Sequence, residues 1–266
     1  MGKNKDLFFY YHEDGKTDTK VEKLQRLAEE NGFQIVNDHR DASIIVSIGG
    51  DGAFLQTVRK TGFRQDCIYI GMSPEGQSGL YCDFNIDHFD EMLHSLKHDE
   101  LEVRRFPIIK TKVNEGTTFY CLNELTIRST IVKTIVIDVH IDDKHFETFR
   151  GDGLIVATPT GSTGYTKSAH GAVIDPLIPC YQVSEIASLN NNQYRTLGSS
   201  FILDKTRQLK LDIIQDGNDH PIISLDNEAL PIRKVQSIEV SMDDKVVKTV
   251  KLKNNTYWDR VKRTFL

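Results

Sequence analysis

The chain has 266 residues, of which 39% are hydrophobic and 27% charged, and its formal net charge is −5. This composition is typical of a globular protein with one large or two modest domains. The negative charge argues against a nucleic-acid binder, and no apolar run approaches the roughly 20 residues of a membrane span. We therefore expect a cytoplasmic protein that binds neither nucleic acid nor membrane.

The cysteines favour neither a metal site nor disulfide bonds. Cys67, Cys82, Cys121 and Cys180 are widely spaced, and no two of them form a Cys-x-x-Cys pair. We expect them to be buried as small apolar residues.

The first hundred residues alternate between strand and helix patterns. Residues 7–11 are aromatic and apolar and predict a strand, whereas residues 17–30 repeat apolar positions at helical spacing before a stop signal at Asn31-Gly32. Residues 33–36 predict another strand, and so do residues 67–70. Alternation of this kind predicts a parallel sheet, whose ligands bind beyond the carboxyl ends of the strands.

A glycine-rich turn interrupts this region after the β-branched run 44–48. Gly49-Gly50-Asp51-Gly52 follows the run, and apolar residues then recur at helical spacing from Phe54. Glycines let a ligand approach the backbone, and the unpaired N–H groups of a helix N-terminus favour phosphate. Gly49, Gly50 and Gly52 are therefore candidates for a loop that holds a phosphate donor.

Asp51 is unexpected in such a loop because a carboxylate repels phosphate. It fits if it binds a metal or handles the group that attacks the phosphate. The alternative is that Asp51 caps the following helix, as Asp often does. Both interpretations remain open at this point.

A second glycine-containing loop, at residues 71–79, is expected at the same edge of the sheet. Residues 87–97 then predict a helix that carries His94 and His98 four positions apart. That spacing is compatible with a metal, but the charged residues around the two histidines favour a solvated face.

From residue 101 the pattern changes to short β-branched segments between turns, which predicts an all-β second domain. We expect the first domain to cover residues 1–100, completed by 247–266, and the β-rich domain to cover residues 101–246. The expected strands are 101–114, 117–129, 133–141, 145–150, 200–203, 208–214, 222–225 and 237–242.

The chain becomes basic after about residue 246. Tyr257, Trp258, Val261 and Phe265 are spaced as the apolar stripe of a closing helix. We expect this helix to dock by that stripe and to leave its basic face in solvent.

The second domain carries three polar clusters. Arg150-Gly151-Asp152-Gly153 again sets a carboxylate between glycines, and residues 158–168 are crowded with hydroxyl groups and small side chains. Such density suits a ligand with many acceptors, such as a nucleotide, although an ordinary polar loop is the alternative. Asn123-Glu124, expected inside a strand, offers an amide for an adenine edge and a carboxylate for ribose hydroxyls, unless neighbouring loops satisfy both.

In their order and spacing, Gly49–Gly52, Asn123-Glu124, Gly151–Gly153 and Thr158–Tyr165 resemble the motifs of bacterial NAD kinases. The resemblance implies an α/β plus all-β fold, with an N-terminal Rossmann-like α/β domain and a C-terminal β-sandwich. It implies transfer of the γ-phosphoryl group of ATP, or of another donor, to the 2′-hydroxyl of the adenosine ribose of NAD. It also implies a divalent metal, with Mg²⁺ expected, and a homo-oligomer, commonly a tetramer or a dimer.

The same resemblance assigns a role to each site residue. Asp51 is similar to the catalytic residue that receives the hydroxyl proton. Asn123 and Glu124 resemble adenosine and ribose contacts, and Ala187 and Tyr194 resemble residues that reach the nicotinamide half, across a subunit contact. The full set of implied substrate-binding residues is Gly52, Asn123, Glu124, Arg150, Asp152, Thr163, Gly164, Tyr165, Thr166, Lys167, Ser168, Ala187, Tyr194 and Asp226.

Three features depart from the family pattern, and two other functions remain open. Ser78-Gly79-Leu80-Tyr81 is only loosely similar to the Leu-Gly-Phe segment of the family. Ala53 stands where threonine is usual and Gly164 where alanine is usual, which leaves donor preference (ATP or polyphosphate) and pocket detail open. A lipid kinase shares the Gly-Gly-Asp-Gly turn, and a non-catalytic NAD(P) sensor would share both nucleotide motifs. Mg²⁺ is expected to balance the donor phosphates, assisted by Lys167 or Arg150.

Overall fold

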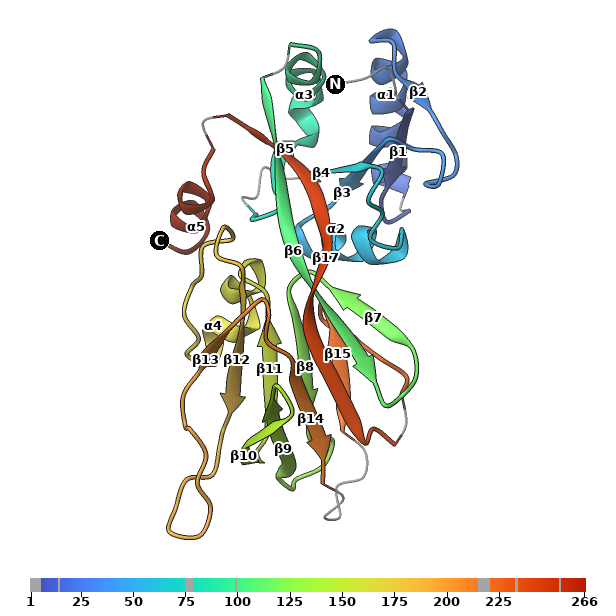
Figure 1. Cartoon of the computed structure of the whole chain (residues 1–266). Helices are drawn as coiled ribbons and strands as arrows, with labels where there is room; N and C mark the ends of the chain where they lie inside the picture. The colour runs from blue at the N-terminus through green and yellow to red at the C-terminus, as the bar shows by residue number, and fades with distance from the viewer. Residues whose placement is uncertain are drawn as a thin grey trace. The chain divides into compact units, whose positions relative to one another are not determined.

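The computed structural model describes residues 6–13, 15–74, 79–98, 100–214, 221–232, 234–253 and 255–266 (Figure 1). The chain divides into two compact units. The first unit contains residues 1–106 and 246–266, and the second contains residues 107–245. Residues 75–78 of the expected loop at 71–79 lie outside the described residues.

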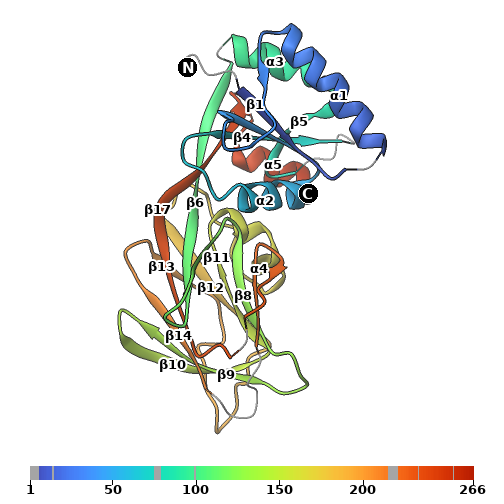
Figure 2. The ribbon, with the colours of Figure 1, turned by 90° about the vertical axis from the view of Figure 1, so that its right-hand side faces the viewer.

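The first unit has a parallel sheet with the strand order β2-β1-β3-β4-β5. Figure 2 shows α1 and α3 on one face of this sheet and α2 on the other. The prediction of a parallel α/β sheet is confirmed. The elements are β1 (Asp6–Tyr10), α1 (Gly15–Glu30), β2 (Gln34–Ile35), β3 (Ile44–Ile48), α2 (Asp51–Lys60), β4 (Ile68–Ser73), β5 (Cys82–Asn85) and α3 (Phe89–Lys97).

Burial explains why the apolar patterns form these elements. All five residues of β3 are buried, as expected for a central strand of a parallel sheet. Helix α1 buries Val21, Leu24 and Ala28, which recur on one face at helical spacing.

Helix α3 begins later than predicted. Ile86–His88 forms a 3₁₀ turn, because the Asn85 side chain accepts a hydrogen bond from the Asp87 N–H at 2.9 Å and caps it there. The rings of His94 and His98 stack at 4.0 Å on the surface of α3. Both histidines are exposed, as expected for a solvated face. Within the residues that the structure describes, no group of three or more His, Cys, Asp or Glu side chains could hold a metal ion.

The second unit is a sandwich of two antiparallel layers. One layer has the order β13-β12-β11-β8-β15-β16, and the other contains β10-β9-β14-β17, with β6 paired to β17 and β7 paired to β6. Its strands are β6 (Leu101–Val113), β7 (Thr118–Cys121), β8 (Glu124–Arg128), β9 (Ile135–Ile141), β10 (Lys144–Gly151), β11 (Gly153–Ala157), β12 (Cys180–Ile186), β13 (Phe201–Asp204), β14 (Leu209–Ile213), β15 (Ile222–Leu225), β16 (Glu228–Ala229) and β17 (Ser237–Leu252). Leu125 and Leu154 from one layer pack with Ile137 and Leu211 from the other in a single core. The fold is therefore α/β plus β-sandwich, as the resemblance implied.

Several strand predictions need correction. The expected strand 117–129 is two strands, β7 and β8, because the N–H groups of Leu122 and Asn123 bond to the Asp226 carboxylate instead of to a neighbouring strand. Strands β11 and β12 were not predicted. Strand β17 continues to Leu252, ten residues beyond the expected end at 242, through the polar run 243–245 that hides its alternation.

The closing helix exists as α5 (Tyr257–Phe265), but its buried side differs from the prediction. Trp258 is 49% exposed and Phe265 is 37% exposed, whereas Arg260 is fully buried. The reason is an ion pair: Arg260 Nη1 lies 3.1 Å from Asp83 Oδ1 in the same unit. The expectation of a solvated basic face holds for Lys262 and Arg263, which are exposed, and is wrong for Arg260.

The expectation for the cysteines is confirmed, since all four are free thiols and buried. Among the described residues, no helix has the length and apolar character needed to cross a membrane.

Candidate active site

Asp51 is the first residue of α2, and it does not cap that helix. The N-cap is Gly50, which makes no side-chain cap bond. The Asp51 carboxylate instead accepts hydrogen bonds from two backbone N–H groups, that of Leu80 at 2.8 Å and that of Tyr81 at 3.0 Å. The capping interpretation is wrong, and the carboxylate is oriented by a segment 29 residues further along the chain.

The glycines around Asp51 lie in two different environments. A Cβ on Gly79 would lie 2.3 Å from Asp51 Oδ1, and a Cβ on Gly49, whose φ is +143°, would lie 2.4 Å from the Cβ of Ala53. These two glycines are required by close packing. Gly50 and Gly52, in contrast, have no atom of the described residues within 4 Å of such a Cβ, so this part of the structure leaves open space in which an anion can approach the N-terminus of α2.

The segment that holds Asp51 also packs on the turn itself. The Tyr81 ring stacks on Phe54 of α2, with the ring centroids 4.9 Å apart and the planes within 3° of parallel. The Cys82 thiol donates to the Gly49 carbonyl at 3.3 Å. Burial, followed by the nearby Asp51 carboxylate, raises the pKa of the Cys82 thiol, so the thiol keeps the proton that it donates.

In the second unit, Asp226 supports Asn123 and Glu124. Asp226 and Asn227 have φ values of +48° and +64° and form the two-residue turn between β15 and β16. The Asp226 carboxylate accepts the Leu122 N–H at 2.9 Å and the Asn123 N–H at 2.6 Å, and the Asp226 N–H donates to the Glu124 carbonyl at 3.0 Å. Asp226 therefore fixes the backbone of the two residues expected to contact the substrate.

Glu124 is the most perturbed acid near this turn. Its side chain is buried, and its Oε2 atom has no hydrogen-bond partner in the part of the chain that the structure describes. Burial, and then the charge of Asp226, raises the pKa of Glu124 to about 8. A Cβ on Gly164 would lie 3.1 Å from Glu124 Oε2, so the glycine that replaces the usual alanine leaves room beside this carboxyl group.

The hydroxyl-rich loop contains η2 (Thr160–Thr163) and α4 (Tyr165–Ser168), and most of its hydroxyls build the loop. Thr158 donates to the Leu122 carbonyl at 2.5 Å, and Thr163 donates to the Thr160 carbonyl at 3.0 Å. The density of hydroxyls thus has a largely structural cause, which the ligand interpretation overlooked. Thr166 is the exception, because its buried Oγ1 has no partner.

The other residues of this loop are more accessible. Tyr165 is half-buried, with the Arg128 guanidinium 5.9 Å from its ring centroid, and Lys167 and Ser168 are exposed. We call Asn123, Glu124, Asp226 and residues 163–168 the Glu124 cluster.

Four further site residues form a separate group, the Arg150 cluster of Arg150, Asp152, Ala187 and Tyr194. The Arg150 guanidinium lies 4.5 Å from the centroid of the Tyr194 ring. Asp152 is exposed in the turn between β10 and β11, where its N–H donates to the Ile186 carbonyl at 2.9 Å, next to Ala187.

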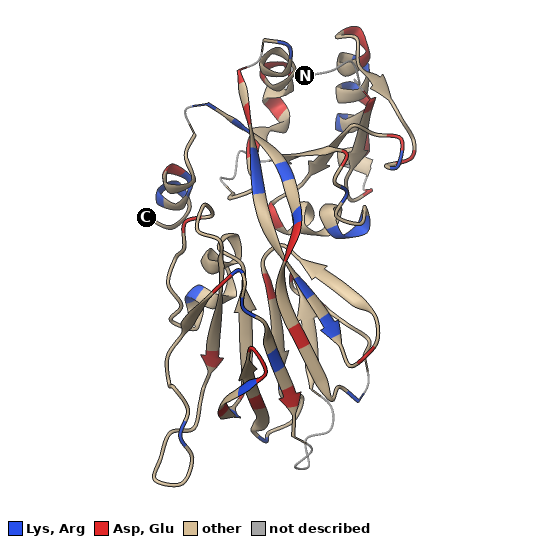
Figure 3. Ribbon diagram, viewed as in Figure 1, with Lys and Arg blue, Asp and Glu red and all other residues tan. Residues whose placement is uncertain are grey.

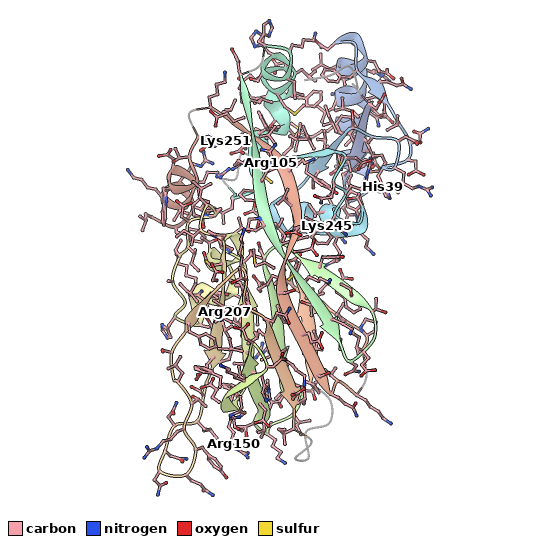
Figure 4. All side chains as sticks on the ribbon, in the orientation of Figure 1. His39, Arg105, Arg150, Arg207, Lys245 and Lys251 are labelled. Carbon is pink, nitrogen blue, oxygen red and sulfur yellow. The ribbon has the colours of Figure 1, made fainter. Side chains whose placement is uncertain are left out.

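The two clusters lie at opposite ends of strand β11. Glu124 pairs with Ala157 at one end, and Arg128 pairs with Gly153 at the other. Five residues of strand extend for roughly 13 Å between the first and last Cα. Arg150 accordingly lies at one end of the second unit in Figure 4, and α4 lies at the other end in Figure 1. The implied substrate residues of this unit therefore form two groups.

The sequence-based prediction missed the segment that orients Asp51. The only signal was the loose likeness of Gly79-Leu80-Tyr81 to a family motif. It also missed the pairing of Asp83 with Arg260, which no local pattern could reveal because 177 positions separate the two residues.

Known proteins share both sequence and fold with this chain. The family described as "ATP-NAD kinase C-terminal domain" matches residues 122–252. A protein of Oceanobacillus iheyensis named NAD kinase 2 is 70% identical over 266 residues, which is 100% of both chains. NAD kinase 2 of Bacillus subtilis is 56% identical over 262 residues, or 98% of both chains.

Two solved structures share the fold. The yeast NADH kinase complexed with NADH has a TM-score of 0.81 at 18% identity, covering 98% of this chain and 86% of that one. The Archaeoglobus fulgidus NAD kinase in complex with ATP has a TM-score of 0.75 at 22% identity, covering 97% and 99%. The full-length identity to the bacterial relatives confirms the resemblance, and the chain belongs to the NAD kinase family of enzymes.

Proposed function

We propose that this kinase transfers the γ-phosphoryl group of ATP to the 2′-hydroxyl of the adenosine ribose of NAD, forming NADP. The observation that carries the proposal is the Asp51 carboxylate, which two backbone N–H groups hold beside the open glycines Gly50 and Gly52. A fixed acceptor for a proton next to a place for phosphate is what transfer to an alcohol requires.

In the proposed reaction, the 2′-oxygen forms a bond to the γ-phosphorus as the bond from that phosphorus to the β–γ bridging oxygen breaks. The hydroxyl proton passes to Asp51, and ADP leaves with the bridging oxygen. Phosphoryl transfer passes through a loose transition state, so orientation of the hydroxyl matters more than its early deprotonation. Asp51 therefore orients the hydroxyl first and receives its proton late.

The donor phosphates are proposed to lie at the N-terminus of α2, where the open space at Gly50 and Gly52 exposes backbone N–H groups. Among the described residues, no three or more His, Cys, Asp or Glu side chains are grouped so that they could coordinate a metal ion by themselves. We propose that Mg²⁺ enters on the donor, coordinated by phosphate oxygens, as is usual for this ion.

The adenosine half of NAD is proposed to bind at the Glu124 cluster. The unpartnered Oε2 of Glu124 would gain a ribose hydroxyl as its partner, which removes the cost of an unsatisfied buried group. Asn123, whose backbone Asp226 fixes, supplies its amide to the adenine edge. Replacing Asn123 with Ala should raise the dissociation constant of NAD about tenfold, as measured by calorimetry.

The Arg150 cluster is proposed to complete the site of a second copy in a homo-oligomer. The separation of the two clusters along β11 supports this assignment. Mixing two variants tests it: Asn123→Ala and Arg150→Ala, each impaired alone, should regain activity when co-refolded, because some sites then combine two intact halves. Activity equal to the average of the separate variants would contradict a shared site.

The test of the function is direct. The purified chain, incubated with NAD, ATP and Mg²⁺, should form NADP, which an NADP-specific dehydrogenase then reduces. Parallel reactions with polyphosphate as donor and NADH as acceptor define the specificity. Binding of NAD without any product would favour the sensor alternative instead.

A further inference from the structure

The C-terminal helix is tied to the site by a buried ionic cluster that the reaction does not use. Asp83 of β5 is 1% exposed, and its carboxylate accepts hydrogen bonds from Arg260 Nη1 at 3.1 Å to both oxygens. Asn255 donates to it at 2.6 Å, and Arg104 forms a further ion pair with it. All four residues belong to the first unit.

The backbone explains why this acid points inward. Strand β5 pairs with β4 through Cys82 and Gly71 and then through Phe84 and Met72, so Asp83 is the extra residue of a β-bulge. A bulge redirects the side chain of its extra residue. Here it directs Asp83 toward α5 and the start of β6, which carry basic residues in Figure 3.

The cluster is poorly suited to a purely stabilising role. Two guanidinium groups share one carboxylate. Four of their buried nitrogens have no hydrogen-bond partner among the described residues, namely Nε and Nη1 of Arg104 and Nε and Nη2 of Arg260. Burial raises the pKa of Asp83 against the opposing effect of Arg260, so the charged form is costly to bury. Such clusters can instead specify one conformation.

The conformation that this ionic cluster can specify is that of the segment preceding β5. Asp83 lies two residues after Tyr81 and three after Leu80, the residues whose N–H groups hold the Asp51 carboxylate. Between them, Cys82 bonds to the Gly49 carbonyl. A shift of Asp83 would therefore move the donors of Asp51 and the glycine turn together.

We propose that Arg260 is a positioning residue for Asp51: it anchors Asp83, and thereby holds the Leu80 and Tyr81 N–H groups in register with the carboxylate. The C-terminal helix is then part of the machinery for turnover without touching the substrate. The catalytic consequence rests on the proposed role of Asp51.

The test compares Arg260→Met with Arg263→Met, which removes the same charge from an exposed position of the same helix. Hydrogen exchange at the Leu80 and Tyr81 amides should accelerate at least about tenfold in Arg260→Met, while the amides of α1 keep their rates. Turnover should fall at least about tenfold with the KM for NAD changed less than about threefold. Arg263→Met should leave both unchanged, and Arg260→Lys should recover part of the turnover.

Unchanged hydrogen exchange at Leu80 and Tyr81 would show that Arg260 does not anchor this segment. That result would not depend on the role of Asp51. Accelerated exchange with normal turnover would show that the anchoring by Arg260 does not contribute to catalysis. Acceleration at every amide alike would show general destabilisation and would also overturn the proposal. If Arg260→Met does not fold, Asp83→Asn, which keeps the side-chain shape and removes the charge, is measured against the same expectations. Retained turnover in Asp51→Asn would contradict the proposed role of Asp51, and with it the catalytic consequence of the anchoring, but not the anchoring itself.

Discussion

The molecule contains two Gly-Asp-Gly turns, Gly50-Asp51-Gly52 and Gly151-Asp152-Gly153, that share a sequence and differ in structure. In the first, the glycines border open space and two backbone N–H groups hold the acid. In the second, a Cβ on Gly153 would lie 2.1 Å from the Ile127 carbonyl oxygen, and the acid is exposed. The same three residues thus border open space in one unit and pack against a strand in the other.

The largest expected effect tests the acid of the first turn. Asp51→Asn should lower kcat by roughly 10²–10⁴-fold while NAD still binds, because the amide cannot take the proton. Steady-state kinetics and calorimetry measure the two quantities. Activity within twofold of the unchanged protein would show that Asp51 does not take part in the reaction.

A matched pair of glycine substitutions tests the difference in packing. Gly153→Ala should destabilise the second unit by roughly 3 kcal/mol, because the new methyl group overlaps the Ile127 carbonyl. Gly52→Ala should change the stability by no more than about 1 kcal/mol but should raise the KM for ATP, since the methyl group enters the open space. Urea unfolding and kinetics separate the two effects, and equal losses of stability would contradict the contrast.

Glu124 is a buried acid of the second unit and Asp152 is an exposed one, and pH distinguishes them. Because the folded-state pKa of Glu124, about 8, lies above its ordinary value of 4.5, its contribution to stability is complete below pH 4.5 and is lost as pH rises through 8. The melting temperature should therefore fall between pH 4.5 and about pH 8. Glu124→Gln should reduce this fall, whereas an equally steep fall in the variant would assign it to another group.

The smallest effect is expected for the acid of the second turn. Asp152→Asn should change the free energy of unfolding by less than about 0.5 kcal/mol, because Asp152 is exposed. Its NAD affinity should fall by no more than about tenfold, the range of one hydrogen bond. Urea unfolding measures the stability and calorimetry measures the affinity. A loss of turnover in Asp152→Asn as large as that in Asp51→Asn would contradict the different roles of the two turns.

The sequence by itself determined the features that local patterns encode. Period-two and period-3.6 apolar repeats predicted the parallel sheet, most strands of the sandwich and the helices α1, α2, α3 and α5, because burial of one face imposes those periods. The motifs also determined the family, since their order along the chain does not depend on folding.

The tertiary structure alone decided what each polar group bonds to. That Asp226 splits the expected strand at Asn123, that Leu80 and Tyr81 hold Asp51, and that Arg260 is buried against Asp83 all depend on partners 29 to 177 positions away. A buried polar group must find a partner wherever the fold brings one, and no local pattern records that partner. The identical Gly-Asp-Gly turns acquire different roles for the same reason.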